Sequence, residues 1–108
     1  MKNRIFRSFE ERMRYLDALA EAEANPVRKC TRYDFVKALK AYDMSLYERL
    51  FTAYQQSSEL QFLWNTVNEL DRDNADFIAM TAQLGIGNDI LDDLFRLVSV
   101  HRVDASIP

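Results

Sequence analysis

The sequence has few residues that interrupt helices, because only 2 glycines and 2 prolines occur among its 108 residues. Their scarcity favours long helices over a β fold, which needs many turns. No segment shows a sustained alternation of apolar and polar residues. Hydrophobic residues still make up 48% of the chain, which is enough for a core. We therefore expect residues 1–108 to form one compact all-α domain of five to six helices.

Cysteine and long apolar runs are also scarce. Cys30 is the single cysteine, so no internal disulfide can form, which favours a reducing compartment. Charged residues interrupt the first 15 residues throughout, and no uninterrupted apolar run approaches about 18 residues. We predict a cytoplasmic protein without a signal peptide, a transmembrane helix or a membrane partner.

Polar residues that cap helix N-termini divide the chain into segments. Ser8 and Glu11 have the spacing of a capping box, and Ser45 with Glu48 repeats it. The stretch QQSSE allows either one continuous helix or a break, and we favour the break. The expected N-caps are Ser8, Thr31, Ser45, Ser57 or Ser58, Asp73 or Asn74, and Asn88.

Apolar residues at helical spacing predict which faces are buried. In the first helix, which Asn25-Pro26 should end, the expected stripe is Phe9, Met13, Leu16 and Ala20, and Tyr15 and Leu19 widen it. A later helix should bury Leu60, Leu63, Trp64, Val67 and Leu70. Gly85 is predicted to end the following helix in a left-handed conformation. We expect residues 1–7 and 102–108 to be frayed.

A helix, a glycine turn and a second helix are predicted at residues 81–95, TAQLGIGNDILDDLF. This order is typical of the helix-turn-helix that reads DNA. The second helix, however, carries Asp89, Asp92 and Asp93, whereas binding to phosphates requires Arg or Lys. These carboxylates argue against DNA binding by this segment. A weaker nucleic-acid hypothesis rests on the basic residues near the start, which are Lys2, Arg4, Arg7, Arg12 and Arg14.

Candidate catalytic groups are sparse. Cys30 precedes a predicted helix and has Arg28, Lys29 and Arg32 as neighbours, features that lower the pKa of a thiol. No base that could activate it is visible in the sequence. His101, the single histidine, is expected to be a solvated surface residue near the end of the chain.

Four carboxylates, at Glu69, Asp71, Asp73 and Asp76, surround one turn and raise the question of calcium. An EF-hand that begins at Asp71 would need glycine and glutamate where Asp76 and Ala82 stand. Helix capping and solvation explain the carboxylates better. We expect no catalytic, cofactor or metal site, and no enzymatic activity.

Protein–protein interaction is then the leading function class. Residues 1–49 carry 11 Lys and Arg against 8 Asp and Glu, a net +3, whereas residues 50–108 carry 3 against 9, a net −6. This asymmetry is either ordinary surface solvation or the mark of a molecule that self-associates head to tail or binds a basic partner. Surplus aromatics at the edges of apolar stripes either pack in the core or anchor a partner. The candidate interface residues are Tyr33, Tyr42, Phe62, Asp89, Asp92 and Asp93.

Two segments, LQFLWNTVNELDRDNADFIAM and the ending LGI…LDDLF, lie within residues 47–95. This region resembles the tail assembly chaperones, small helical proteins encoded in the tail modules of long-tailed bacteriophages and prophages. The resemblance implies a cytoplasmic, non-enzymatic helper that coats the tape measure protein, keeps it soluble and helps to recruit tail tube subunits. The alternatives are another tail or head–tail component of a phage, and a nucleic-acid-binding regulator.

Overall fold

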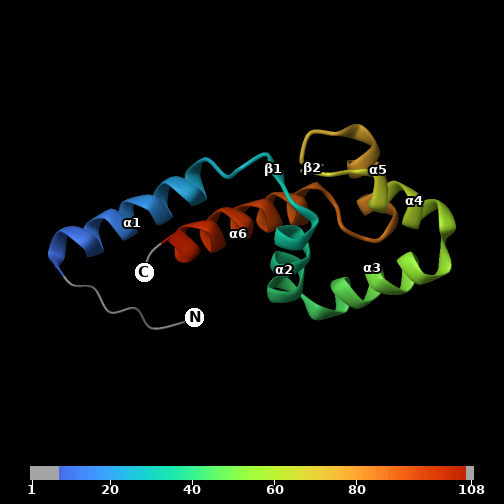
Figure 1. The fold of residues 1–108 in the computed structure, drawn as a ribbon, viewed down its shortest axis with the longest axis horizontal. Coiled ribbons are helices and arrows are strands. Elements are labelled where there is room, and N and C mark those ends of the chain that lie inside the picture. Colours follow the sequence, from blue (N-terminus) through green and yellow to red (C-terminus); the bar gives the residue numbers. More distant parts are fainter. Residues whose placement is uncertain (1–7, 107–108) are drawn as a thin grey trace.

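The computed structural model describes residues 8–106, and residues 1–7 and 107–108, where we expected fraying, lie outside the described part. Within this described part, six helices form an all-α fold, as the sequence predicts, together with one small antiparallel sheet (Figure 1). The helices are α1 (Phe9–Ala24), α2 (Arg32–Tyr42), α3 (Met44–Gln56), α4 (Ser58–Thr66), α5 (Ala75–Gln83) and α6 (Asn88–Ser106). The strands are β1 (Lys29–Cys30) and β2 (Leu70–Asp71).

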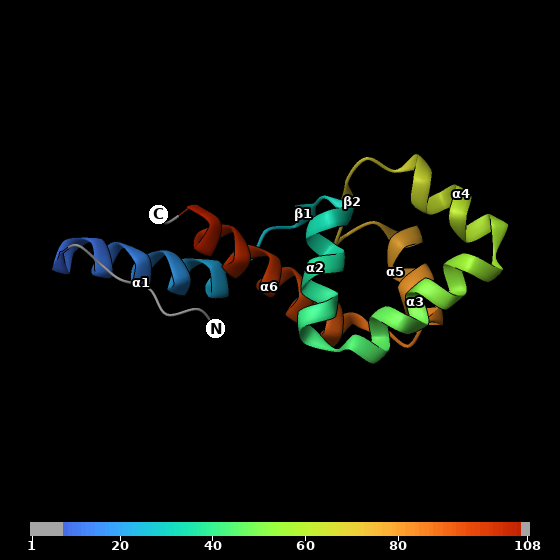
Figure 2. The same ribbon diagram turned by 60° about the horizontal axis from the view of Figure 1, so that its bottom comes forward.

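The long helix α6 is the spine of the molecule. Helix α1 runs antiparallel beside it, since Tyr15 near the start of α1 bonds Asp104 near the end of α6. Helix α2 packs across α6, α3 packs on α2, and α4 packs on α3 (Figures 1 and 2). The result is elongated, with extents of 51 × 23 × 23 Å. The largest core side chains without exposed surface are Phe35, Leu39, Ile86, Leu91, Leu94 and Phe95.

Four predicted N-caps are confirmed by hydrogen bonds to their side chains. The clearest is at the predicted break, where the Ser57 hydroxyl accepts the Leu60 amide at 3.1 Å and starts α4. Ser57 and Ser58 were both candidate caps, and the structure shows that Ser57 is the cap. The other confirmed caps are Ser8, Thr31 and Asn74.

Two predicted caps are wrong. Helix α3 begins after Asp43, whose carboxylate accepts both the amide and the hydroxyl of Ser45, so Ser45 lies inside the first turn. Helix α6 begins at Asn88, and the carbonyl of Gly87 accepts its first helical bond from Leu91 at 3.0 Å. The Asn88 side chain does not cap the helix, because its oxygen accepts a bond from the Arg72 guanidinium at 3.2 Å.

Gly85 ends α5 as predicted. Its φ of +81° lies in the left-handed region, where glycine has no steric penalty. The amides of Gly85 and Ile86 donate to the carbonyls of Ala82 and Thr81 at 3.0 and 2.9 Å. This paired arrangement is the Schellman motif, and it turns the chain from α5 into α6.

The predicted buried stripe of α4 is only partly correct, because Leu63 and Val67 are exposed and Leu70 lies outside the helix. Helix α4 ends at Thr66, and Leu70 lies in β2, where it pairs with Cys30. Lys29 pairs with Asp71 in the same ladder. A two-residue strand is too short to show an alternation of apolar and polar residues, so the sheet could not be predicted from the sequence pattern. The pairing fastens the segment after α4 against the segment before α2.

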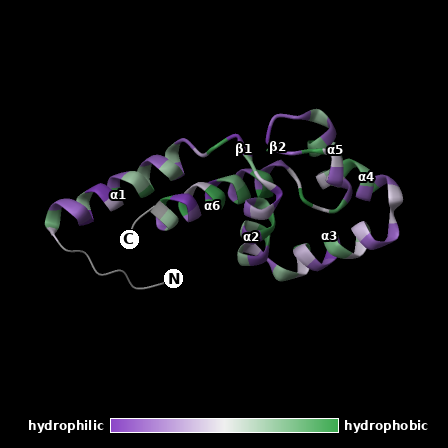
Figure 3. Cartoon of the chain, viewed as in Figure 1, coloured by the Kyte–Doolittle hydropathy of each residue, from purple (hydrophilic) through white to green (hydrophobic). Residues whose placement is uncertain are grey.

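Helix α1 leaves the centre of its predicted stripe exposed and covers only the residues that widen it. Tyr15, Leu19 and Ala22 face α6, whereas Phe9 is 75% exposed. At 3.6 residues per turn, the centre of the predicted stripe lies about a third of a turn away from these contacts. Hydrophobic and hydrophilic residues alternate along the whole helix (Figure 3).

The first turn of α1 extends past the end of α6 in both views (Figures 1 and 2). The predicted fraying is wrong for residues 102–106, which form the last turn of α6. Asp104 in this turn accepts the Tyr15 hydroxyl at 2.7 Å, which ties the end of α6 to α1.

Candidate functional site

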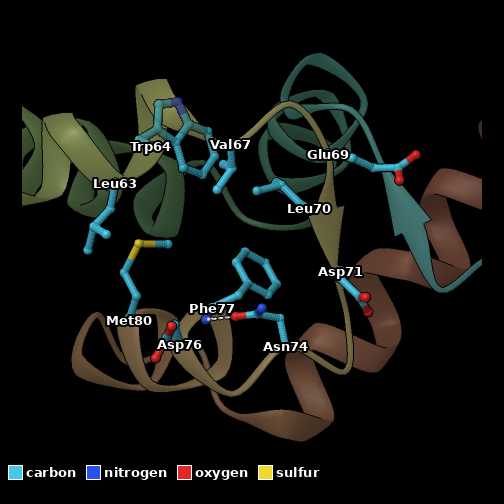
Figure 4. A pocket seen from close by; sticks show the side chains of 10 residues that line it. All are labelled: Leu63, Trp64, Val67, Glu69, Leu70, Asp71, Asn74, Asp76, Phe77 and Met80. Carbon is cyan, nitrogen blue, oxygen red and sulfur yellow. Dashed lines mark hydrogen bonds between the residues drawn. The ribbon is translucent and has the colours of Figure 1, made fainter.

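An apolar pocket of about 160 Å³ opens between α4 and α5. Helix α4 packs closely on α3 but not on α5, which leaves this space open. Figure 4 shows the side chains of Leu70, Phe77 and Met80 directed toward it. The apolar lining consists of Leu63, Trp64, Val67, Leu70, Phe77 and Met80.

A second and larger hollow, of about 540 Å³, adjoins the pocket. The two share Leu63, Asp76 and Met80 as lining residues, so they form one continuous depression. Its further walls come from α3, the start of α4 and the end of α5, at Ala53, Ser57, Glu59, Leu60, Ala79, Gln83 and Leu84. We call the two hollows together the α4–α5 groove.

Tertiary hydrogen bonds hold the walls of the groove in place. The Arg32 guanidinium of α2 donates to the Trp64 carbonyl at 3.0 Å and fixes the end of α4. The side-chain amide of Gln61 donates a hydrogen bond to the Tyr54 carbonyl at 2.7 Å and ties α4 to α3. On the other wall the Asn74 cap positions the first turn of α5, which presents Phe77 to the pocket. The groove is therefore a built feature of the fold.

All charged residues that line the groove are acidic. They are Glu59, Glu69, Asp71 and Asp76. None of them forms an ion pair with a residue of the described part of the chain. Glu69 and Asp71 point outward at the rim, beside the apolar interior (Figure 4). The groove thus combines an apolar floor with an unneutralised negative edge.

The predicted interface residues do not gather into one surface. Phe62 lies on α4 and is 67% exposed, but it does not line the groove. Tyr33, on α2, is 76% exposed. Tyr42 ends α2 and donates a bond to Asp93 at 3.4 Å. Partial burial and the Asp93 carboxylate together raise the pKa of the Tyr42 phenol.

The three aspartates of α6 have different surroundings. Asp89 is exposed in the first turn. The Asp92 carboxylate accepts a hydrogen bond at 2.8 Å from the buried Arg72 guanidinium. This ion pair links α6 to the segment after β2. Asp93 pairs with Arg96 of the next turn at 2.8 Å. Asp92 and Asp93 therefore hold internal contacts.

The thiol of Cys30 is not activated, although its neighbours in the sequence are of the kind that lower the pKa of a thiol. It lies in the core without exposed surface, while Arg28 turns away to bond Asp73. Burial raises the pKa of the Cys30 thiol to about 12, although Arg102 lowers it slightly. The effect expected from the positive neighbours is absent because burial of the sulfur is the dominant influence on its pKa.

We expect Cys30 to resist a water-soluble thiol reagent at pH 8 for as long as the protein is folded. A thiol that is buried and protonated offers almost no thiolate for attack. Absorbance of released thionitrobenzoate measures the reaction, and full labelling should appear on unfolding in urea. Ala41→Cys, which adds an exposed thiol on α2, is the positive control and should react at once. Rapid labelling of the natural folded protein would contradict the buried position.

His101 is not the solvated surface residue that we expected. It is half-buried on α6, and its Nδ1 has no hydrogen-bond partner among the described residues. Burial and then the charge of Lys37 lower the pKa of its imidazole.

The carboxylates considered for calcium serve the turn between β2 and α5. Asp71 accepts the Asp73 amide at 2.8 Å, and Asp73 pairs with Arg28. The bond from Arg28 lowers the pKa of the Asp73 carboxyl. Within residues 8–106 no three potential metal-ligating side chains come together. No helix in that range is long and apolar enough to cross a membrane.

No family model, curated protein or solved structure matches this chain. The residues that line the α4–α5 groove all lie within residues 53–84.

Proposed function

We propose that this protein is a non-enzymatic tail assembly chaperone of a long-tailed phage, which binds the tape measure protein in the host cytoplasm. The observation that carries the proposal is the open apolar groove between α4 and α5. The resemblance to tail assembly chaperones falls on the residues that build this groove. The same resemblance supports a further role in recruiting tail tube subunits.

A groove between two helices suits a helical client. An amphipathic helix can lay its apolar face into such a groove and remove it from water. Burial of apolar surface yields roughly 25 cal/mol per Å², so a few large side chains suffice for reversible binding. A protein that binds a long helical client in this way and keeps it from aggregating has the role of a tape measure chaperone.

Co-expression with the tape measure protein encoded beside this chain tests the proposal. We expect more of that protein in the soluble fraction, and a complex of the two that survives gel filtration. Unchanged solubility together with no complex would contradict it. Recovery of this chain from purified virions would instead favour a tail or head–tail component.

A pair of matched variants locates the binding surface. Leu63 in the groove is 42% exposed, and Leu16 on α1 at the other end of the molecule is 44% exposed. Leu63→Asp should abolish the gain in client solubility, whereas Leu16→Asp should preserve it. Equal loss in both variants would count against the groove.

A further inference from the structure

We infer that the α4–α5 groove selects an amphipathic helix whose apolar stripe is flanked by Lys or Arg, and that one large apolar side chain of this helix enters the pocket beside Trp64. The inference rests on the proposed function and names the chemistry of the client segment. It follows from three features of the groove: its charge, the size of its pocket and the length of its walls.

The charge of the lining favours a basic partner. Glu59, Glu69, Asp71 and Asp76 occur around the groove without a lysine or arginine among the lining residues. Each carboxylate is available to an incoming cation, because ion pairs within the described residues use other acids. An acidic partner would meet like charges at both ends of the groove. Rim charges of one sign therefore discriminate between partners and accelerate association with the complementary one.

The exposed stripe on α1 shows that this charge pattern is particular to the groove. Phe9, Met13 and Leu16 are similarly exposed there, but Glu10 and Arg12 place both signs of charge beside them. A surface with mixed charges has no preference for a basic partner. The two apolar surfaces therefore differ in the feature that selects a basic helix.

The size of the pocket indicates its anchor. Its volume of about 160 Å³ is close to that of an apolar protein cavity of about 150 Å³ that holds a benzene molecule. One leucine, methionine or phenylalanine side chain therefore fits among Trp64, Val67 and Phe77. A buried anchor of this kind commonly supplies most of the binding energy of an interface.

The length of the walls sets the length of the helix. Helices α4 and α5 have 9 residues each, which at 1.5 Å per residue corresponds to walls of about 13 Å. A bound helix would contact the groove over two to three turns. Apolar residues at i, i+3 or i+4, and i+7 span that distance, and basic residues on either side of the stripe reach the rim.

Fluorescence of Trp64 provides a direct measurement, because it is the single tryptophan of the chain and lines the pocket. Three synthetic peptides of about 18 residues serve as probes. The first has leucines at helical spacing and lysines elsewhere, the second replaces every lysine with glutamate, and the third contains the residues of the first in an order without helical spacing. We expect the first to shift Trp64 emission and to bind at least about tenfold more tightly than either control at low salt.

Charge variants test the role of the rim. Glu69→Gln combined with Asp76→Asn should weaken binding of the lysine peptide at least about fivefold, and should reduce its dependence on salt. Glu10→Gln combined with Asp17→Asn removes the same charge from exposed positions on α1 and should leave binding unchanged. Circular dichroism confirms that each variant is folded.

Three results would overturn the inference. One is equal affinity for the lysine and glutamate peptides, and another is binding of the peptide without helical spacing as tightly as the first. The third is an equal loss of affinity in the α1 variant, which would indicate attraction by net charge alone.

The inference and the proposed function fail separately. Binding of the lysine peptide with no effect on the tape measure protein would leave the groove's selectivity intact and remove the chaperone role. Rescue of the tape measure protein by the charge-neutralised groove variant would keep the chaperone role and overturn the selectivity.

Discussion

Replacement of Phe35 with alanine is expected to lower the free energy of unfolding by about 3–5 kcal/mol. The Phe35 ring has no exposed surface and lies 5.5 Å from the ring of Phe77, 6.2 Å from Phe95 and 6.3 Å from Trp64. It therefore joins α2 to α4, α5 and α6. With alanine, the protein would lose the favourable free energy of transferring the ring from water into the core. A cavity would also remain, because the four helices are packed too tightly to move in and fill it.

Urea unfolding followed by circular dichroism measures this loss. Tyr33→Ala is the matched control, because it removes an exposed aromatic from the same helix and should change stability by less than about 0.5 kcal/mol. If Phe35→Ala does not fold at all, Phe35→Leu should fold with a loss of about 1 kcal/mol, since it retains most of the volume. A loss below about 1 kcal/mol for Phe35→Ala would show that the aromatic core is misplaced.

Gly85→Val is expected to cost about 2–3 kcal/mol. The φ of +81° places the backbone where a β-branched side chain is strained. A Cβ atom at this position would also meet Nη1 of Arg49, which donates to the Leu84 carbonyl. Valine would thus strain the Schellman turn and displace the guanidinium that braces it.

Gly87 is the natural comparison for Gly85. A Cβ there would meet no heavy atom within 4 Å, and its φ is not in the left-handed region. Gly87→Ala should cost less than about 1 kcal/mol, through a weaker helix cap alone. Thermal and urea unfolding of both variants measure the difference. Similar losses at the two glycines would contradict the special role of the turn at Gly85.

Local signals in the sequence predicted much of the fold because their interactions are local. The caps at Ser8, Thr31, Ser57 and Asn74 each involve an amide three residues later, so the spacing of residue types reveals them. The turn at Gly85 is similar, because its two bonds stay within six residues. The failure at Ser45 is also local, because Asp43 two residues earlier is the cap, whereas the failure at Asn88 has a long-range cause. The guanidinium of Arg72, which lies 16 residues earlier in the chain, donates a hydrogen bond to the Asn88 side chain, so this side chain does not cap α6.

The orientation of α1 is a second long-range effect. Both of its sides carry apolar residues, and nothing within the helix indicates which one α6 will cover. The chosen side includes Tyr15, whose hydroxyl reaches Asp104 across 89 residues. A periodic pattern indicates that one face of a helix is apolar, but it does not indicate which other helix will cover that face.

The candidate site was only partly visible in the sequence. Phe62 is exposed, as its position off the apolar stripe suggests, but it does not line the groove, which forms because α4 ends at Thr66 and the chain turns back through β2. The signal that could have indicated it was the placement of Glu59, Glu69, Asp71 and Asp76 among large apolar residues. Their spacing was tested for calcium, while their common position around an apolar depression depends on tertiary structure.

The elongation of the molecule will affect how it migrates. Its radius of gyration is 15.7 Å, whereas a folded chain of this length typically has about 13 Å. A rod-like monomer diffuses more slowly than a sphere of equal mass, so it leaves a sizing column early and can be mistaken for a dimer. Light scattering or sedimentation equilibrium, which do not depend on shape in this way, should therefore decide the stoichiometry of any complex that this protein forms.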